Sequence, residues 1–442
     1  MKKLNKRFTS SQIIMIGFAL VILAGSLLLM LPFATQDGSG ATFGDALFTA
    51  TSAVCVTGLI LHDTATYWTV FGQCVIITLI QIGGMGVITV AVALSVISGK
   101  KISLKQRSTM QEAISAPKVG GIVKLTGFII LGTLLIELLG ALLMAPTFCS
   151  QFGFGKGLWY SIFHAISAFC NAGFDLMGVR EQYSSLTSFV TNPAVNIAIM
   201  SLIVIGGIGF MTWEDVKSHK LNFRRYRMQS KVILTTTACL ILIPAVYFFF
   251  FEFSGLPLAE RFWSSMFQSV TARTAGFNTA DLTSLSEVGI ALMIILMVIG
   301  GSPGSTAGGM KTTTFAVMLS TAVSVFRHRE HTHFFGRRIP EQVLRNAATL
   351  MTMYLVLFMG GGFIISRVED LPLLTCLYET ASAIGTVGLT LGITPELGAV
   401  SRGILIGLMY FGRVGGLTLI FAATAANRGI TARFPQEKLT VG

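Results

Sequence analysis

The segment LYETASAIGTVGL, Leu377–Leu389, lies near the C-terminal end of a very apolar chain. It combines an aromatic residue, a Ser/Thr-Ala pair and a glycine that is followed by a large apolar residue. The same pattern recurs in LFTATSAVCVTGL (Leu47–Leu59), IFHAISAFCNAGF (Ile162–Phe174) and MFQSVTARTAGF (Met266–Phe277). Because internal repeats reveal the organisation of a chain, we expect four similar units, at 1–99, 100–228, 229–338 and 339–442.

The composition places these units in a lipid bilayer. The 442 residues are 52% hydrophobic and 12% charged, and the mean hydropathy is +0.73. The first apolar segment, Gln12–Leu31, contains no charged residue and is long enough to cross a hydrocarbon core of about 30 Å. It is followed by Leu31-Pro32-Phe33 rather than by a small-residue cleavage site, so we expect it to be a retained spanning helix and not a signal peptide.

The net charge of +12 has a topological explanation. Basic residues cluster in alternate loops between the long apolar segments, and acidic residues such as Asp63 and Asp281 occupy the other loops. The positive-inside rule therefore predicts that the basic loops and both termini are cytoplasmic. A nucleic-acid partner is not needed to explain the charge and is not expected.

Each unit repeats one order of parts. A spanning helix comes first, near 12–33, 119–148, 230–253 and 341–366, and a short helix, the glycine loop and a returning helix follow. The returning helices are expected near 70–98, 193–216, 286–326 and 400–427. Since short apolar segments are typically re-entrant, the predicted fold is an all-α membrane protein with eight spanning helices and four re-entrant pore helices. Four buried loops of this kind are expected to converge with fourfold pseudo-symmetry round one pore per chain.

The four loops have the chemistry of a cation filter. Backbone carbonyls from four strands can replace the hydration shell of a cation, and glycine adopts the required backbone conformation at little cost. Pore helices that point their negative ends at the centre would also favour cations. The alternative is that the small residues only let helices pack closely. The candidate filter residues are Val56, Thr57, Gly58, Asn171, Ala172, Gly173, Thr274, Ala275, Gly276, Thr386, Val387 and Gly388.

With these loops, and with QIGGMG (Gln81–Gly86), GGIGF (Gly206–Phe210) and GRVGGLT (Gly412–Thr418), the chain resembles the Trk/Ktr/HKT superfamily of cation transporters. It is most similar to the membrane subunits of the bacterial Ktr potassium uptake systems. This resemblance implies a protein of the bacterial cytoplasmic (inner) membrane. It also implies potassium selectivity, because Gly58 stands where some sodium-conducting plant relatives have serine.

The third unit differs from the others at GGSPGSTAGGMKTTT, Gly300–Thr314, where five glycines and Pro303 interrupt the returning helix. Only this unit is predicted to be strongly broken, and the break at about 302–314 is a candidate gate. The resemblance implies an intramembrane loop that obstructs the pore beneath the filter and moves on activation. The candidate gate residues are Ser302, Gly304, Ser305, Thr306, Ala307, Gly308, Gly309 and Lys311.

Three further charged residues lie in apolar surroundings. Arg413 is in the fourth returning helix, where the resemblance places an arginine close to the gate loop, although both Arg413 and Lys311 could instead reach the cytoplasmic interface. Arg273 is in the third filter loop, and we expect it to point behind the filter and donate to loop carbonyls or to Glu379. Glu137 has no partner that the sequence identifies.

Other function classes fit less well. GSTAGGMKT, Gly304–Thr312, resembles a nucleotide-binding loop, but Met310 separates the lysine from the second glycine, so no nucleotide is expected on this chain and no enzyme activity. His328, His331 and His333 lie in a loop that is also rich in arginine and are not expected to hold a metal. No cofactor is expected beyond the transported potassium ion, with sodium as a candidate activator. An alternating-access transporter and a sodium or ammonium pathway remain the alternatives.

The resemblance also implies the partners. It implies a homodimer in which each protomer has its own pore, and a cytoplasmic ring of RCK-domain subunits that bind the regulatory nucleotide. The C-terminal segment RFPQEKLTVG, Arg433–Gly442, resembles a tail that ends at the dimer interface.

Overall fold

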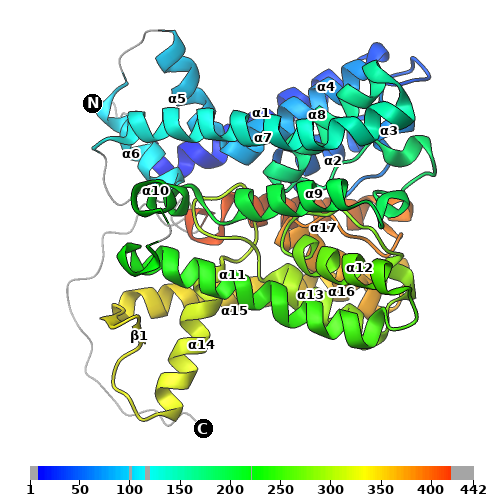
Figure 1. Cartoon of the computed structure of the whole chain (residues 1–442). Helices are drawn as coiled ribbons and strands as arrows, with labels where there is room; N and C mark the ends of the chain where they lie inside the picture. The colour runs from blue at the N-terminus through cyan, green and yellow to red at the C-terminus, as the bar shows by residue number, and fades with distance from the viewer. Residues whose placement is uncertain (1–7, 99–101, 115–119, 221, 420–442) are drawn as a thin grey trace.

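The computed structural model describes residues 8–98, 102–114, 120–220 and 222–419, and these residues are almost entirely helical (Figure 1). The first two units contain α1 (Ser10–Leu29), α2 (Phe43–Val54), α3 (Thr64–Tyr67), α4 (Val70–Met85), α5 (Val87–Ile97), α6 (Leu104–Ala113), α7 (Ile122–Phe152), α8 (Phe154–Cys170), α9 (Pro193–Gly207) and α10 (Phe210–His219). The last two contain α11 (Met228–Tyr247), α12 (Leu258–Thr271), α13 (Glu287–Val298), α14 (Thr312–Phe326), α15 (Glu341–Glu369), α16 (Leu373–Gly385) and α17 (Ala399–Val414).

The prediction of an all-helical membrane protein is confirmed. By length and composition, four of the described helical segments can cross a membrane: α1, α7, α15 and α11 with the π-helical turn that extends it to Glu252. Two further spans are possible if the bent pairs α4–α5 and α9–α10 each count as one. The long helices lie roughly parallel in Figure 1, and α5 and α14 turn across them at one end of the molecule.

The short helices α2, α8, α12 and α16 form the centre of the protein. Their C-terminal halves are almost entirely buried, as in the run from Tyr378 to Gly385 of α16. Small and hydroxyl side chains fill this region, so neighbouring backbones can approach each other closely. Leucines of the surrounding helices, such as Leu138 of α7, are exposed and face outward. The core therefore sits around the ends of the four short helices.

The prediction that only the third returning helix is strongly broken is wrong. The α4–α5 pair bends by 94° at Gly86 and the α9–α10 pair by 98° near Gly209. Both glycines have a positive φ, +87° and +91°, and Gly415 at the end of α17 has a φ of +90°. A backbone at positive φ cannot continue a right-handed helix, so each glycine turns the chain.

Each glycine at which the chain turns is preceded, three residues earlier, by another glycine. Gly83, Gly206 and Gly412 each precede a bending glycine by three residues. A side chain on any of them would collide with a backbone carbonyl near the end of α2, α8 or α16, that of Val54, Phe169 or Ile384. The first glycine therefore brings the returning helix against the pore helix, and the second turns the chain away.

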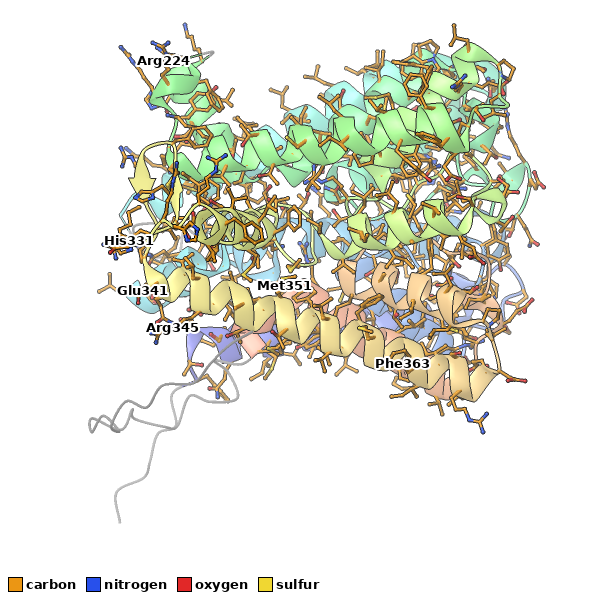
Figure 2. All side chains as sticks on the ribbon, turned by 90° about the horizontal axis from the view of Figure 1, so that it is seen from below. Arg224, His331, Glu341, Arg345, Met351 and Phe363 are labelled. Carbon is orange, nitrogen blue, oxygen red and sulfur yellow. The ribbon has the colours of Figure 1, made fainter. Side chains whose placement is uncertain are left out.

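The described residues include one exception to the all-helical prediction, a two-stranded hairpin of β1 (His333–Phe334) and β2 (Arg337–Arg338). Figure 2 shows His331 at the same end of the molecule as Arg224, Glu341 and Arg345, whereas Met351 and Phe363 lie farther along α15. Arg224, His331 and the start of α15 therefore lie at one end of the molecule.

We expect Gly209→Ala to destabilise the protein by roughly 1–3 kcal/mol, because the new methyl group would be held at a positive φ and would lie 2.7 Å from the carbonyl oxygen of Pro303. The measurement is the thermal midpoint of the detergent-solubilised protein. Gly121→Ala is the matched control, since Gly121 has a φ of +80° but open space around it. Equal midpoints for the two variants would contradict the packing role.

Candidate functional site

The four glycine loops share one backbone conformation. Each loop has a residue at positive φ, followed two positions later by its glycine, also at positive φ. The pairs are Val56 (52°) and Gly58 (90°), Asn171 (59°) and Gly173 (69°), Thr274 (82°) and Gly276 (86°), and Thr386 (51°) and Gly388 (93°). Positive φ is unfavourable for valine and threonine, so the surrounding structure must enforce it. The same strain at four places indicates one functional constraint.

The four glycines form a closed ring. A methyl group on Gly58 would lie 2.5 Å from the carbonyl oxygen of Ala172, and one on Gly173 would lie 2.7 Å from that of Ala275. In the same way, a methyl group on Gly276 would collide with Val387, and one on Gly388 would collide with Thr57. Each loop therefore packs against the next, and the fourth packs against the first. The twelve predicted filter residues lie together in this ring.

A hydroxyl from each pore helix supports its loop. The side chains of Ser52 and Ser382 accept hydrogen bonds from the N–H groups of Gly58 (3.1 Å) and Gly388 (3.0 Å). In the other two loops, Ser167 donates to the carbonyl of Phe174 and Thr271 to that of Phe277. These four hydroxyls are not among the residues predicted from the sequence. Their constant place in the repeated Ser/Thr-Ala pair could have identified them.

The candidate gate loop connects α13 to α14 and contacts the second and fourth glycine loops. Its backbone is hydrogen-bonded to the bend between α9 and α10: Ser302 N–H donates to Gly207 O (3.0 Å) and Thr306 N–H to Gly206 O (3.2 Å). On the other side, Gly309 N–H donates to Gly412 O of α17 at 3.2 Å. The loop thus crosses between the second and fourth units.

Two contacts join the gate loop to the filter. Thr306 Oγ1 donates to Phe169 O (2.9 Å) and accepts a hydrogen bond from Asn171 Nδ2 (2.9 Å) in the second filter loop. Gly308 lies against the Thr386 side chain of the fourth filter loop, so closely that a methyl group on this glycine would collide with it. The predicted gate residues therefore lie in contact with two filter loops.

Both predicted gate cations bind carbonyls. Lys311 Nζ donates to Ala307 O at 2.9 Å, within the gate loop itself. The Arg413 guanidinium donates to Thr306 O of the gate loop and to Gly83 O and Gly84 O (2.9 Å for the latter) of α4. Arg413 therefore fastens the loop to the first unit. In this structure neither side chain extends away from the loop into solvent, because its donors are bound to carbonyls.

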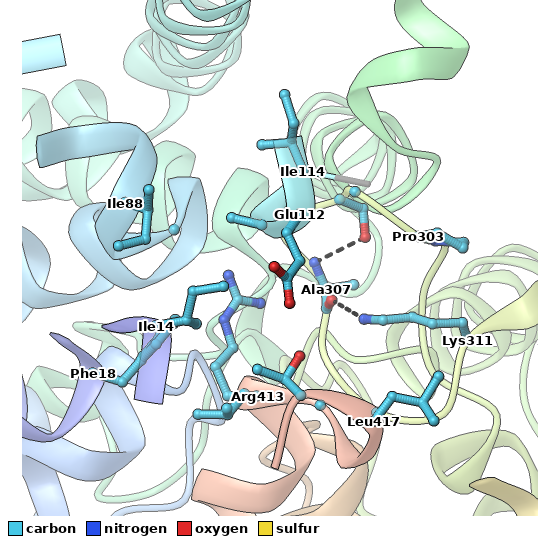
Figure 3. A pocket seen from close by; sticks show the side chains of 18 of the residues that line it. Ile14, Phe18, Ile88, Glu112, Ile114, Pro303, Ala307, Lys311, Arg413 and Leu417 are labelled. Atoms are coloured by element: carbon cyan, nitrogen blue, oxygen red, sulfur yellow. Dashed lines mark hydrogen bonds between the residues drawn. The ribbon is translucent and has the colours of Figure 1, made fainter. Parts of the chain in front are cut away.

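A cavity of about 260 Å³ lies beside the gate loop (Figure 3). Arg413, Lys311 and Glu112 line it, and Glu112 accepts a hydrogen bond from Ser11 at 2.7 Å. This bond ties α6 to α1. Gly304 of the gate loop lies against the carbonyl of Ile114, which directly follows α6. The cavity is therefore bounded by the gate loop and by α6.

The predicted partners of Arg273 are wrong. Arg273 is buried, with 7% of its surface exposed, but in the described part of the chain its guanidinium donates no hydrogen bond to a loop carbonyl or to Glu379. Glu379 instead accepts hydrogen bonds from Thr390, Thr394 and the N–H group of Leu391. These bonds hold the chain that leaves the fourth filter loop, so the acid is already satisfied.

Residues 5–429 match the TrkH family, described as cation transport proteins. The chain is 41% identical to the Ktr system potassium uptake protein B of Bacillus subtilis, over 99% of this chain and 97% of the relative. It is 39% identical to the potassium/sodium uptake protein NtpJ of Enterococcus hirae, over 100% and 99%. The crystal structure of the potassium transporter TrkH from Vibrio parahaemolyticus has the same fold, with a TM-score of 0.75 at 19% identity, covering 96% of this chain and 86% of that one.

These matches and the ring of loops define a multi-pass membrane transporter and not an enzyme. The chain belongs to the TrkH/Ktr family of cation transport proteins.

We expect Thr306→Val to lower the stability of the protein by about 1–3 kcal/mol, because the hydroxyl bonds to Phe169 and Asn171 are lost while the side-chain shape is kept. The thermal midpoint in detergent reports the change. Thr349→Val is the control, since the hydroxyl of Thr349 bonds only to a carbonyl of its own helix and is exposed. An unchanged midpoint for Thr306→Val would show that the hydroxyl does not hold the loop.

Proposed function

We propose that this protein translocates potassium across the bacterial cytoplasmic membrane into the cell, through a pore at the centre of the four filter loops. The observation that carries the proposal is the closed ring of Gly58, Gly173, Gly276 and Gly388. A ring of backbone carbonyls held by four strained loops is suited to replace the hydration shell of a cation.

The arrangement round this pore is our interpretation of the repeats. Four units would each contribute a leading helix, a pore helix and a returning helix, which gives eight spans with fourfold pseudo-symmetry. The two apolar helices α13 and α14 would together make the third returning span, interrupted by the gate loop. The charged loops at the end shown in Figure 2 would face the cytoplasm, together with both termini.

Potassium is the preferred ion, and sodium is the second candidate. Every loop has a glycine at the ring position. In the filters that this ring resembles, a serine at the first of these positions goes with sodium, so four glycines favour potassium. The name of the Enterococcus hirae relative, a potassium/sodium uptake protein, supports keeping sodium as an alternative substrate or an activator. No bound cofactor is needed for either reading.

The gate loop would close the pathway in the present conformation. It lies beneath the filter, and it is held by Arg413 and by the Thr306–Asn171 bond. The two positive charges of Lys311 and Arg413 at this place would also oppose the passage of a cation. Opening would require the loop to release these contacts.

Regulation would come from a partner chain. We expect a cytoplasmic ring of RCK-domain subunits that binds the nucleotide, and a homodimer of this chain. The Bacillus subtilis relative is named as a component of a Ktr system, which supports such a partnership. The C-terminal tail, Arg433–Gly442, that would reach the dimer interface lies outside the described residues.

The bends in the first two returning helices bear on the alternating-access alternative. Broken helices in transporters of that class come in pairs from inverted repeats. Here the glycines at the bends, Gly86, Gly209 and Gly415, occupy the same position in units that share one orientation. They therefore support a common device for positioning the filter rather than two opposed half-sites.

We expect Gly58→Ser to reduce the preference for potassium over sodium by at least about tenfold, which corresponds to ~1.4 kcal/mol, because a side chain here would displace the backbone of Ala172. The measurement is growth on limiting potassium of a bacterium that lacks potassium uptake, together with potassium and sodium uptake by the same cells.

Gly153→Ser is the matched control for this experiment, since Gly153 also has a positive φ, +81°, but a Cβ atom added there would have no neighbouring atom within 4 Å. Gly58→Ser with the wild-type preference would mean that the loops are packing motifs and that the pore lies elsewhere.

We expect deletion of residues 304–309 to raise potassium flux severalfold in the absence of the RCK partner, because the chain beneath the filter is removed. Rubidium uptake into proteoliposomes measures the flux. Arg413→Gln tests the same contact by a smaller change and should raise flux in the same direction. If both variants conduct no more than the wild type without its partner, the loop does not close the pathway.

A further inference from the structure

Glu137 is a carboxyl group inside the membrane protein that the proposed filter and gate do not use. It lies in the middle of α7 with only 5% of its surface exposed. Its neighbours Leu134, Leu135, Leu138 and Leu139 are all more than half exposed and face outward. Carboxyl groups at such positions are costly, and a retained one usually has a functional reason.

The Glu137 side chain has one partner. Its Oε2 accepts a hydrogen bond from Gln81 Nε2 of α4 at 3.2 Å, and its Oε1 is buried without a partner. The amide oxygen of Gln81 in turn accepts a hydrogen bond from Cys170 Sγ at 3.5 Å. Gln81 thus joins the second unit's first helix to the end of its pore helix.

This short chain of polar groups ends at the filter and the gate. Cys170 directly precedes Asn171, the strained residue of the second filter loop that also binds Thr306 of the gate loop. Gln81 lies two and three residues before Gly83 and Gly84, whose carbonyls accept the Arg413 guanidinium. A shift of Gln81 would therefore reach both the second filter loop and the acceptors of Arg413.

We propose that Glu137 is a positioning residue: its carboxyl oxygen holds the Gln81 amide, and Gln81 holds the end of α8 and with it the second filter loop. The role is that of a hydrogen-bond acceptor, because the contact is made by one oxygen to one N–H group. This inference rests on the proposed potassium function, since it assigns Glu137 to the selectivity of that filter.

The test compares Glu137→Leu with Glu137→Gln by potassium and sodium uptake into proteoliposomes, normalised to the amount of protein reconstituted. Glu137→Leu removes the acceptor, and we expect the preference for potassium over sodium to fall about fivefold, as expected for the loss of one hydrogen bond. Glu137→Gln keeps an acceptor oxygen and should keep the wild-type preference. Wild-type preference in Glu137→Leu, or an equal loss in both variants, would overturn the acceptor role.

Two further variants separate this role from a general loss of folding. Thr133→Val is the matched control: Thr133 lies one turn away on the same buried face of α7, and its hydroxyl has no hydrogen-bond partner among the described residues. It should leave the preference unchanged, and a loss as large as that of Glu137→Leu would overturn the proposal. Gln81→Leu removes the same bond from the other side and decides the question if Glu137→Leu does not accumulate in the membrane.

The double variant Glu137→Leu/Gln81→Leu should be no worse than the worse single variant, because the two changes break one chain of contacts. If the losses of potassium preference in the two single variants add up in the double variant, Glu137 and Gln81 do not act through one chain of contacts. Gly58→Ser in the same assay keeps the two proposals apart. If the wild type prefers potassium and Gly58→Ser does not, the filter assignment stands whatever the Glu137 variants show. If the wild type takes up no potassium, the proposed function fails and this inference fails with it.

Discussion

The structure depends on the lack of room for a side chain at four glycines. Gly58, Gly173, Gly276 and Gly388 each face the backbone of the next loop, so a ring of this diameter closes only if all four lack a Cβ atom. Each of these glycines also has a positive φ, which turns the chain so that neighbouring loops can pack against each other. The ends of the short helices and the hydroxyls that support the loops lie around this ring.

A second constraint is that backbone groups inside a membrane protein must find partners. The gate loop is irregular, yet its N–H groups donate to Gly206, Gly207 and Gly412 of neighbouring helices. The carbonyls in turn receive the two cations that the sequence places nearby, Lys311 and Arg413. The cations are bound to carbonyl dipoles rather than to carboxylates. They therefore hold the loop through hydrogen bonds to its backbone and not through an ion pair.

The sequence predicted the parts that are local and repeated. The filter loops could be found because one glycine follows a Ser/Thr-Ala pair in four places, and the gate loop because Pro303 and its glycines stop a helix. The bends at Gly86 and Gly209 were missed because the apolar pattern continues through them, and a glycine's φ is not visible in hydropathy. The partners of Arg273, Glu379 and Glu137 were missed or mistaken because they depend on which distant segments meet in space.

The four units have the same backbone conformation in the ring but make different side-chain contacts outside it. These contacts can differ because the ring is built from one chain. A homotetramer would repeat every contact four times. Here the second loop offers Asn171 to Thr306 and the fourth offers Thr386 to Gly308, while the third unit contains the candidate gate loop between α13 and α14. Gln81 belongs to the first unit, and its side chain lies between Cys170 and Glu137 of the second unit. A single chain thus combines a ring of four similar loops with one-sided attachments that hold a single further loop against that ring.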